Sequence, residues 1–251
     1  MGRYSRARRK NFRRTLFAKL GLDPDYRKVF AIGFNKTATT SIAEVLSACG
    51  LFTAHDIFWR DTDSLFYHWR YQGFTDGPPD NFVTLDRRFA KSRFILNTRD
   101  LSEWLDSRLA HVEIERARGG DPHMDYWQTP RLAAKEWIKQ RNHHHASVLR
   151  YFRDRPQDLL VINYVRDAEA PHRIADFVGR PRVVGRPHAH TLHTGRQHGD
   201  LRYGEIIEEA LRSLRIPQSE WANDLLCPSL GGVAGLPADT SDLEALRIAA
   251  Q

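Results

Sequence analysis

Three short apolar runs, each followed by a helical pattern, constrain the fold of this chain more than any other feature. The runs are VFAIGF at residues 29–34, RFILNT at 93–98 and LLVINY at 159–164. Continuous apolar runs of this length are typical of strands buried on both faces. Alternation of strands and helices predicts a three-layer α/β fold, in which helices flank a central parallel sheet. The loops at the carboxyl ends of the strands should then carry the functional site.

Periodic apolar residues place the expected helices. After the first strand, Ile42, Val45, Leu46 and Cys49 recur at helical spacing, and Gly50 ends the pattern. Similar patterns predict helices over the segments 99–117, 131–152, about 168–178 and 203–215. We expect a loop over residues 180–200, which are rich in Arg, His and Gly.

Composition limits the cellular context. The chain has 251 residues and 41% hydrophobic side chains, enough to bury one sizeable core. It has no apolar run of the roughly 20 residues that a membrane span needs, and no apolar secretory signal at its N-terminus. We therefore expect a cytoplasmic protein. Cys49 and Cys227 are its only cysteines and lack metal-ligand spacing, so neither a disulfide framework nor a metal site is expected.

The positive charge is concentrated at the N-terminus. Residues 1–28 contain ten of the 38 basic side chains and two of the 31 acidic ones, so this segment carries +8 and the rest carries −1. We expect a basic arm over residues 1–27, one domain over 28–227 and an irregular tail over 228–251. The arm could contact anionic lipids peripherally at the inner membrane surface or bind nucleic acid. It could equally be a solvated, partly disordered tail, and no nucleic-acid partner is expected.

The loop after the first strand has the chemistry of an anion site. Backbone N–H groups and the positive end of a helix dipole converge where a strand leads into a helix. Lys36 adds a full charge, and Thr37, Thr39 and Thr40 add hydroxyl donors. A phosphate is the expected guest. The nucleotide triphosphatase pattern G-x-x-x-x-G-K-[ST] is not met, because Gly33 is the only glycine of this loop and lies three residues before the lysine.

The sequence KTATT in this loop resembles the 5′-phosphosulfate loop of the sulfotransferases, Lys-x-Gly-Thr-Thr. Lys36, Thr39 and Thr40 match, and Ala38 stands where the family commonly has Gly. A second motif, FILNTRDLSEWLDSRL, resembles the segment in which an arginine and a serine eight residues later bind the 3′-phosphate of the donor. Arg99 and Ser107 take those places. The two motifs occur in the family's order, each after its own buried strand.

Weaker similarities extend the resemblance over residues 28–190. Tyr164 lies where the family's third strand often ends in an aromatic residue that packs on adenine, although a structural tyrosine is an equal alternative. Arg196, in GRQHGD, falls near the place of a late element that also contacts the 3′-phosphate.

The resemblance implies a P-loop NTPase-like sulfotransferase fold and a metal-free reaction. A sulfuryl group would pass from 3′-phosphoadenosine-5′-phosphosulfate (PAPS) to a hydroxyl or amine of a small-molecule, glycan or lipid acceptor. Lys36 would stabilise the leaving phosphate. The residues expected to hold the 5′-phosphate are Asn35, Lys36, Thr37, Ala38, Thr39, Thr40 and Ser41.

The acceptor's proton requires a base near the loop. His55 is the first candidate, because an imidazole titrates near physiological pH. Asp76 is the reserve, and Asp56 is a third option.

Two other functions are compatible with the sequence. One alternative is a P-loop kinase or phosphotransferase that uses ATP and magnesium. The other is a non-catalytic, nucleotide-binding or membrane-associated protein.

The consecutive residues His143, His144 and His145 point in different directions on a helix and are expected on a solvated face. No metal is expected at the loop histidines His188, His190, His193 and His198.

Overall fold

The computed structural model describes residues 2–23, 25–119, 130–182, 185, 187 and 201–230. The described residues group into two compact units. Unit 1 contains those between residues 1 and 97 and between 155 and 191. Unit 2 contains those between residues 98 and 154 and between 192 and 249.

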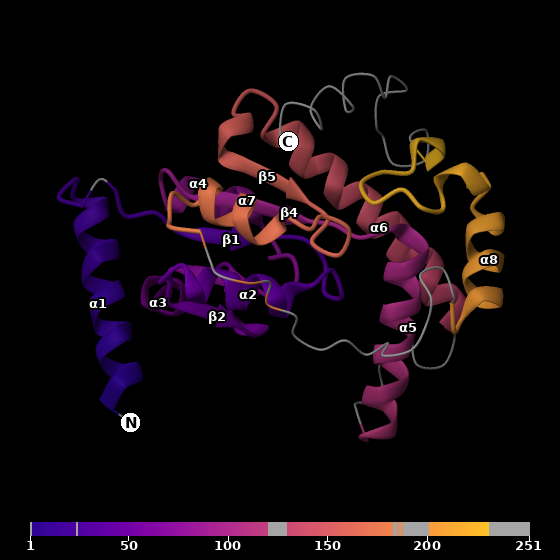
Figure 1. The fold of residues 1–251 in the computed structure, drawn as a ribbon, viewed down its shortest axis with the longest axis horizontal. Helices are drawn as coiled ribbons and strands as arrows, with labels where there is room; N and C mark the ends of the chain where they lie inside the picture. Colours follow the sequence, from indigo (N-terminus) through magenta and orange to yellow (C-terminus); the bar gives the residue numbers. More distant parts are fainter. Residues whose placement is uncertain are drawn as a thin grey trace. The chain divides into compact units, whose positions relative to one another are not determined.

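Unit 1 is built on a parallel five-stranded sheet (Figure 1). Its strands are β1 (Val29–Ala31), β2 (Thr53–His55), β3 (Gly73–Thr75), β4 (Arg93–Asn97) and β5 (Leu159–Ile162), in the order β2-β3-β1-β4-β5. Every strand pair is parallel, which confirms the predicted α/β class. β2 and β3 were not expected from the sequence, because three residues are too few to give a periodic signal.

Helices flank the sheet on both faces, because successive side chains of each strand point to opposite sides. Val29 and Ala31 of β1 pack in an apolar cluster with α2 (Thr39–Ala48) and α7 (Ala170–Phe177). Phe30 points the other way and stacks on Phe74 and Phe94, with ring centroids 4.8 and 5.4 Å away. That aromatic layer meets η1 (Phe58–Arg60), α3 (Leu65–Arg70) and the end of α4 (Phe82–Arg88).

The basic arm forms a helix, α1 (Gly2–Lys19), which belongs to unit 1 and packs against α3. The rings of Phe12 and Trp69 lie 5.0 Å apart, and Arg8 donates a 2.7 Å hydrogen bond to the Tyr71 hydroxyl. Thr15 is buried, and its Oγ1 lies 3.3 Å from the Trp69 carbonyl oxygen. The alternative of a disordered tail is therefore wrong for these residues.

Unit 2 consists of the helices α5 (Leu101–Ala117), α6 (Pro130–Tyr151) and α8 (Gly204–Ser213), which pack on one another. Arg141 donates to the Asn223 carbonyl at 3.2 Å, and the amide of Cys227 donates to Asn142 Oδ1 at 2.7 Å. His145 is buried, with Nδ1 2.6 Å from the Leu225 carbonyl oxygen. The expected solvated face is thus wrong for His145, whereas His143 is exposed.

Short 3-10 turns complete the described elements: η3 (Pro156–Asp158), η4 (Gln218–Glu220) and η5 (Pro228–Leu230). Of the expected tail, only residues 228–230 are described. Among the described helices, none combines the length and apolarity required to cross a membrane. Cys49 and Cys227 are buried free thiols.

Candidate functional site

The carboxyl edge of the unit 1 sheet collects the polar residues that the sequence singled out. Since all five strands are parallel, the ends of β1, β2, β3 and β4 open onto the same edge. The loop between β1 and α2 leaves this edge, and the strand ends add His55, Thr75 and Asn97. The site is built from this loop and these three side chains.

Asn97 holds the loop to the sheet. Its Oδ1 accepts a 2.9 Å hydrogen bond from the Gly33 amide, and its Nδ2 donates to Thr37 Oγ1. Thr37 in turn donates to the Phe34 carbonyl at 2.6 Å. All three hydrogen bonds are internal to the loop and the end of β4. Asn97 was not predicted as a site residue, although a polar residue at the end of an apolar strand was a visible signal.

Gly33 is required by this close packing. A Cβ atom at position 33 would lie 2.0 Å from the Asn97 carbonyl oxygen and 2.7 Å from Asn97 Cγ. No side chain fits there unless the backbone of β4 shifts. The glycine therefore permits contact between neighbouring strands, a role separate from any contact with a ligand.

The loop backbone turns sharply before α2. Lys36 and Ala38 both adopt the left-handed conformation, with φ of 66° and 65°. Ala38 is the N-cap of α2 and offers no side-chain hydrogen bond, and the first turn of α2 contains no acidic residue. The positive end of the helix dipole is thus not offset by a carboxylate of its own turn.

The threonines of the loop do different things. Thr37 has a single hydroxyl proton, which the Phe34 carbonyl accepts, so its side chain can donate to a phosphate only if this bond is given up. The role of Thr37 as a hydroxyl donor therefore stays a prediction, and its backbone amide is not involved in this bond. Thr39 and Ser41 are buried, whereas Thr40 is half-buried. Asn35 and Lys36 are also half-buried.

His55 is exposed and lies beside the loop. Its Nδ1 is 2.8 Å from Thr75 Oγ1, and its Nε2 is 3.1 Å from Thr40 Oγ1. If Nε2 carries the proton, His55 donates to Thr40, and the Thr40 hydroxyl can donate to a ligand. If Nδ1 carries it, Thr40 donates to the imidazole instead. Thr75, buried at the end of β3, was missed because β3 itself was missed.

The two alternative bases are engaged with structural partners. Asp76 has φ of 102°, and its carboxylate lies 3.7 Å from the Arg60 guanidinium, which also donates to the Asp76 carbonyl. Asp56 accepts from the Phe58 amide at 2.9 Å and from the Tyr67 hydroxyl. Burial, together with the bond to Asp56, raises the pKa of Tyr67 above its usual value. The choice of base among His55, Asp76 and Asp56 stays a prediction.

The Arg99 and Ser107 motif belongs to unit 2. Arg99 precedes α5, and its Nε lies 3.6 Å from the Glu103 carboxylate. Ser107 is buried, one turn after Glu103 on the same side of α5. The Arg99 carbonyl accepts a 3.1 Å hydrogen bond from Arg141. A phosphate at Arg99 would have to compete with Glu103.

Of the two remaining candidates for nucleotide binding, the structure describes Tyr164 but not Arg196. Tyr164 is 1% exposed, belongs to the core cluster around α2 and α7, and donates a 2.8 Å hydrogen bond to the Pro187 carbonyl. The structure therefore favours the structural role for this tyrosine over stacking on adenine. Arg196 lies outside the described residues, as do the loop histidines His188, His190, His193 and His198.

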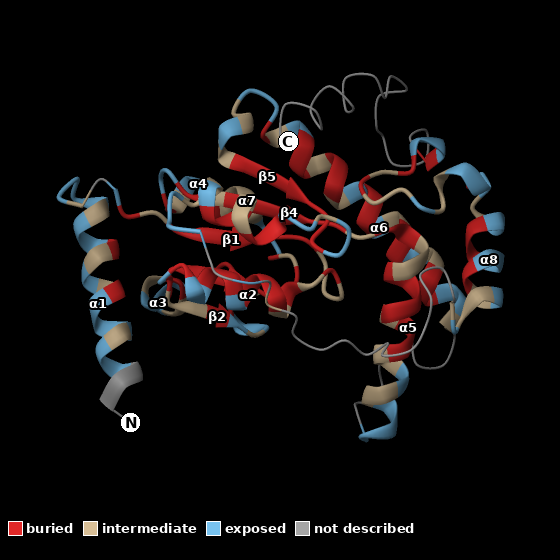
Figure 2. Cartoon of the chain, viewed as in Figure 1, coloured by how far each residue is buried: buried red, intermediate tan, exposed pale blue. Residues whose placement is uncertain are grey.

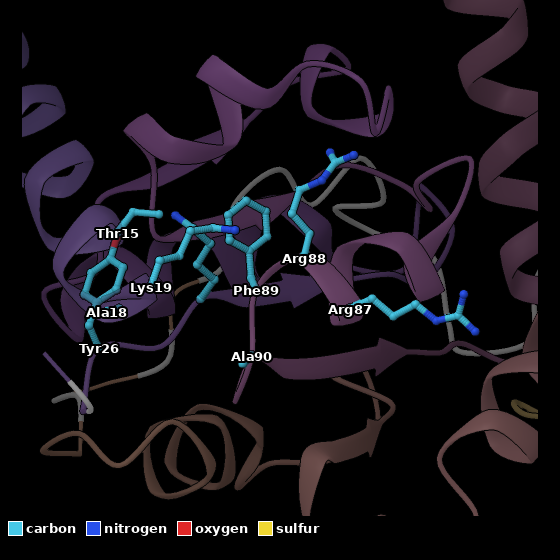
Figure 3. A pocket seen from close by; sticks show the side chains of 9 residues that line it. Thr15, Ala18, Lys19, Tyr26, Arg87, Arg88, Phe89 and Ala90 are labelled. Atoms are coloured by element: carbon cyan, nitrogen blue, oxygen red, sulfur yellow. The ribbon is translucent and has the colours of Figure 1, made fainter. Parts of the chain in front are cut away.

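A cavity of about 190 Å³ lies elsewhere in unit 1, between α1 and the end of α4 (Figure 3). Lys28 lines it, but its ammonium donates to the His68 and Tyr71 carbonyls, both at 2.7 Å. Burial and the charge of Lys19 hold the pKa of Lys28 well below its usual value. Figure 3 shows Arg87 and Arg88 extending away from Lys19, so these cations do not converge on one anion.

Comparison of the chain with models of protein families, with curated proteins and with solved structures found no match. Function is therefore inferred from the residues described above.

Proposed function

We propose that this chain is a sulfotransferase that moves a sulfuryl group from PAPS to a hydroxyl or amine of an acceptor. The observation that carries the proposal is the loop after β1. Asn97 fixes this loop at the carboxyl edge of the sheet, its Lys36 supplies a cation, and its Thr40 lies 3.1 Å from the imidazole of His55. A cation, a helix N-terminus and a base thus lie together within unit 1.

Each of these groups has a separate role in the transfer reaction. A bond forms between the acceptor oxygen or nitrogen and sulfur, while the bond between sulfur and the bridging oxygen breaks. The acceptor's proton passes to His55 Nε2. The electron pair stays on the leaving 5′-phosphate, which Lys36 and the amides at the start of α2 stabilise. The nucleotide product is adenosine 3′,5′-bisphosphate.

The hydrogen bonds of His55 with the Thr75 and Thr40 hydroxyls determine which tautomer can act as the base. If Nδ1 accepts a hydrogen bond from Thr75, the lone pair of Nδ1 is occupied and Nε2 carries the proton. Nε2 must then lose this proton before it can act as a base. With Nδ1 donating to Thr75, Nε2 carries a lone pair, and the acceptor hydroxyl must replace Thr40 as its partner. We therefore assign the second tautomer to the reactive state. Displaced from His55, the Thr40 hydroxyl can donate to the 5′-phosphate.

The 3′-phosphate of the donor is assigned to Arg99 and Ser107. In the sequence, Arg99 follows Asn97 by two residues. The guanidinium already has an anionic neighbour in Glu103, 3.6 Å away, and the phosphate would share or displace it. Arg99 would then supply preference for a nucleotide that carries a 3′-phosphate.

An acceptor screen with radiolabelled PAPS tests the proposal. The native protein should label at least one alcohol, phenol, sugar or amine, and Lys36→Ala should label none. Lys91→Ala, at an exposed lysine elsewhere in unit 1, is the control and should retain activity. Failure of the native protein to bind PAPS would contradict the proposal. Magnesium-dependent binding of ATP without preference for a 3′-phosphate would instead favour a phosphotransferase.

A further inference from the structure

The helix α1 has two chemically different faces. Residues that pack on unit 1 recur at helical spacing: Asn11 and Thr15 are buried, and Phe12 stacks on Trp69. Lys19 continues this face, with its ammonium 5.8 Å from the centre of the Trp69 ring. The helix is therefore seated on α3 along one side, which fixes the side that it turns outward.

The outward face begins with cations. Arg6, Arg9, Lys10 and Arg13 follow one another at spacings of three or four residues, on the side opposite Thr15, and all four are exposed. Exposed residues run along this side of α1 in Figure 2. Among the described residues 5–22 there is no acidic side chain, and the first one, Asp23, pairs with Arg14 at 2.8 Å.

The same face ends in apolar side chains. Leu16, Phe17 and Leu20 continue the spacing of the cations, and they are 37%, 38% and 62% exposed. Leu22, just beyond the helix, is 69% exposed. Large apolar side chains gathered at the surface in this way indicate a binding surface. The outward face is thus cationic along most of its length and apolar at the end that joins the domain.

We propose that this outward face of α1 binds the surface of a bilayer rich in anionic lipids. Arg6, Arg9, Lys10 and Arg13 would contact the phosphate groups, while Phe17 and Leu20 insert at the boundary between headgroups and acyl chains. The charges alone would suit any polyanion, including nucleic acid. The apolar end of the same face is what selects a membrane. This inference does not depend on the proposed sulfotransferase activity.

Vesicle sedimentation of the full chain tests the proposal. The two vesicles are phosphatidylcholine alone and phosphatidylcholine mixed equally with phosphatidylglycerol. The native protein should bind only the mixed vesicles. Arg9→Gln with Arg13→Gln should weaken binding by roughly thirtyfold, since each cation near an anionic surface contributes about a fivefold increase. Phe17→Asp with Leu20→Asp should weaken it by more than about tenfold.

Matched variants at other exposed positions serve as controls. Arg150→Gln with Arg180→Gln makes the same change in charge, and Leu132→Asp replaces an exposed apolar residue on α6. Both should bind as the native protein does. Circular dichroism checks that every variant is folded. Equal loss in the controls, or binding unaffected by Phe17→Asp with Leu20→Asp, would overturn the proposal. So would tighter binding to duplex DNA than to the mixed vesicles.

Discussion

Ala38 occupies a backbone conformation that suits glycine better than alanine. Its φ is 65°, and left-handed backbone costs an ordinary residue about 1–2 kcal/mol. Ala38→Gly removes this strain but makes the unfolded chain more flexible, and this flexibility offsets about 0.4–1 kcal/mol of the gain in stability. We expect a net stabilisation of about 0.5–1 kcal/mol in urea unfolding. The control, Ala48→Gly in the same helix, should be destabilising by up to about 1 kcal/mol. Equal losses for both variants would show that the loop is not strained at Ala38.

His55 is the residue on which turnover should depend most after Lys36. Once an acceptor is known, His55→Ala should lower kcat by about a hundredfold or more, because it removes the base. Its affinity for adenosine 3′,5′-bisphosphate should stay within about twofold. His172→Ala, at a half-buried histidine of α7, should change neither quantity. Unchanged kcat for His55→Ala would transfer the role to Asp76 or Asp56.

The hydrogen bonds from Asn97 of β4 to the loop between β1 and α2 should keep this loop rigid. Asn97→Ala removes two hydrogen bonds from a buried site, and we expect a loss of about 1–3 kcal/mol in unfolding free energy. Hydrogen exchange gives a local readout. The Gly33 amide should lose protection in the variant, while the Phe30 amide within β1 should keep it. Unchanged protection at Gly33 would contradict this role for Asn97.

The longer elements could be predicted from the sequence, and the short ones could not. The run at 93–98 predicted β4, and the periodicity at 131–152 predicted α6, because packing on the core repeats over several turns or residues. β2 and β3 have three residues each, and their pairing depends on neighbours distant in the chain. The hydrogen bonds of His55 to Thr40 and Thr75 depend on that pairing. Only the approximate place of His55, after the first helix, was visible in the sequence.

At the scale of the whole molecule, the alternation of strands and helices did not reveal which helices pack together. The segment at 99–117 was predicted as a helix without a stated partner, and α5 packs with α6 and α8 in unit 2. Hydrophobic spacing shows that a helix has an apolar face, but not which partner covers it. His145 illustrates the same limit. It follows two other histidines in the sequence, and the Leu225 carbonyl that pairs with it lies 80 residues away.

The burial of His145 should make stability depend on pH. Burial holds its pKa well below the usual value of about 6.5, so the unfolded chain takes up a proton that the folded protein excludes. The contribution of neutral His145 to the free energy of unfolding is present above about pH 6.5 and is lost as the pH falls. Between about pH 7.5 and about pH 5.5, the native protein should lose about 1 kcal/mol more than His145→Asn. Urea midpoints at both pH values give this difference, and parallel losses in the two proteins would contradict it.

The measurement that tests the central claim most directly is calorimetric titration with adenosine 3′,5′-bisphosphate and with adenosine 5′-monophosphate. The native protein should bind the bisphosphate at least about tenfold more tightly, since one phosphate then gains a charge-assisted contact. Arg99→Ala should abolish this preference, whereas Lys36→Ala should weaken binding of both nucleotides. Equal affinity of the native protein for the two, or no binding of either, would contradict the assignment of the two motifs to a single nucleotide.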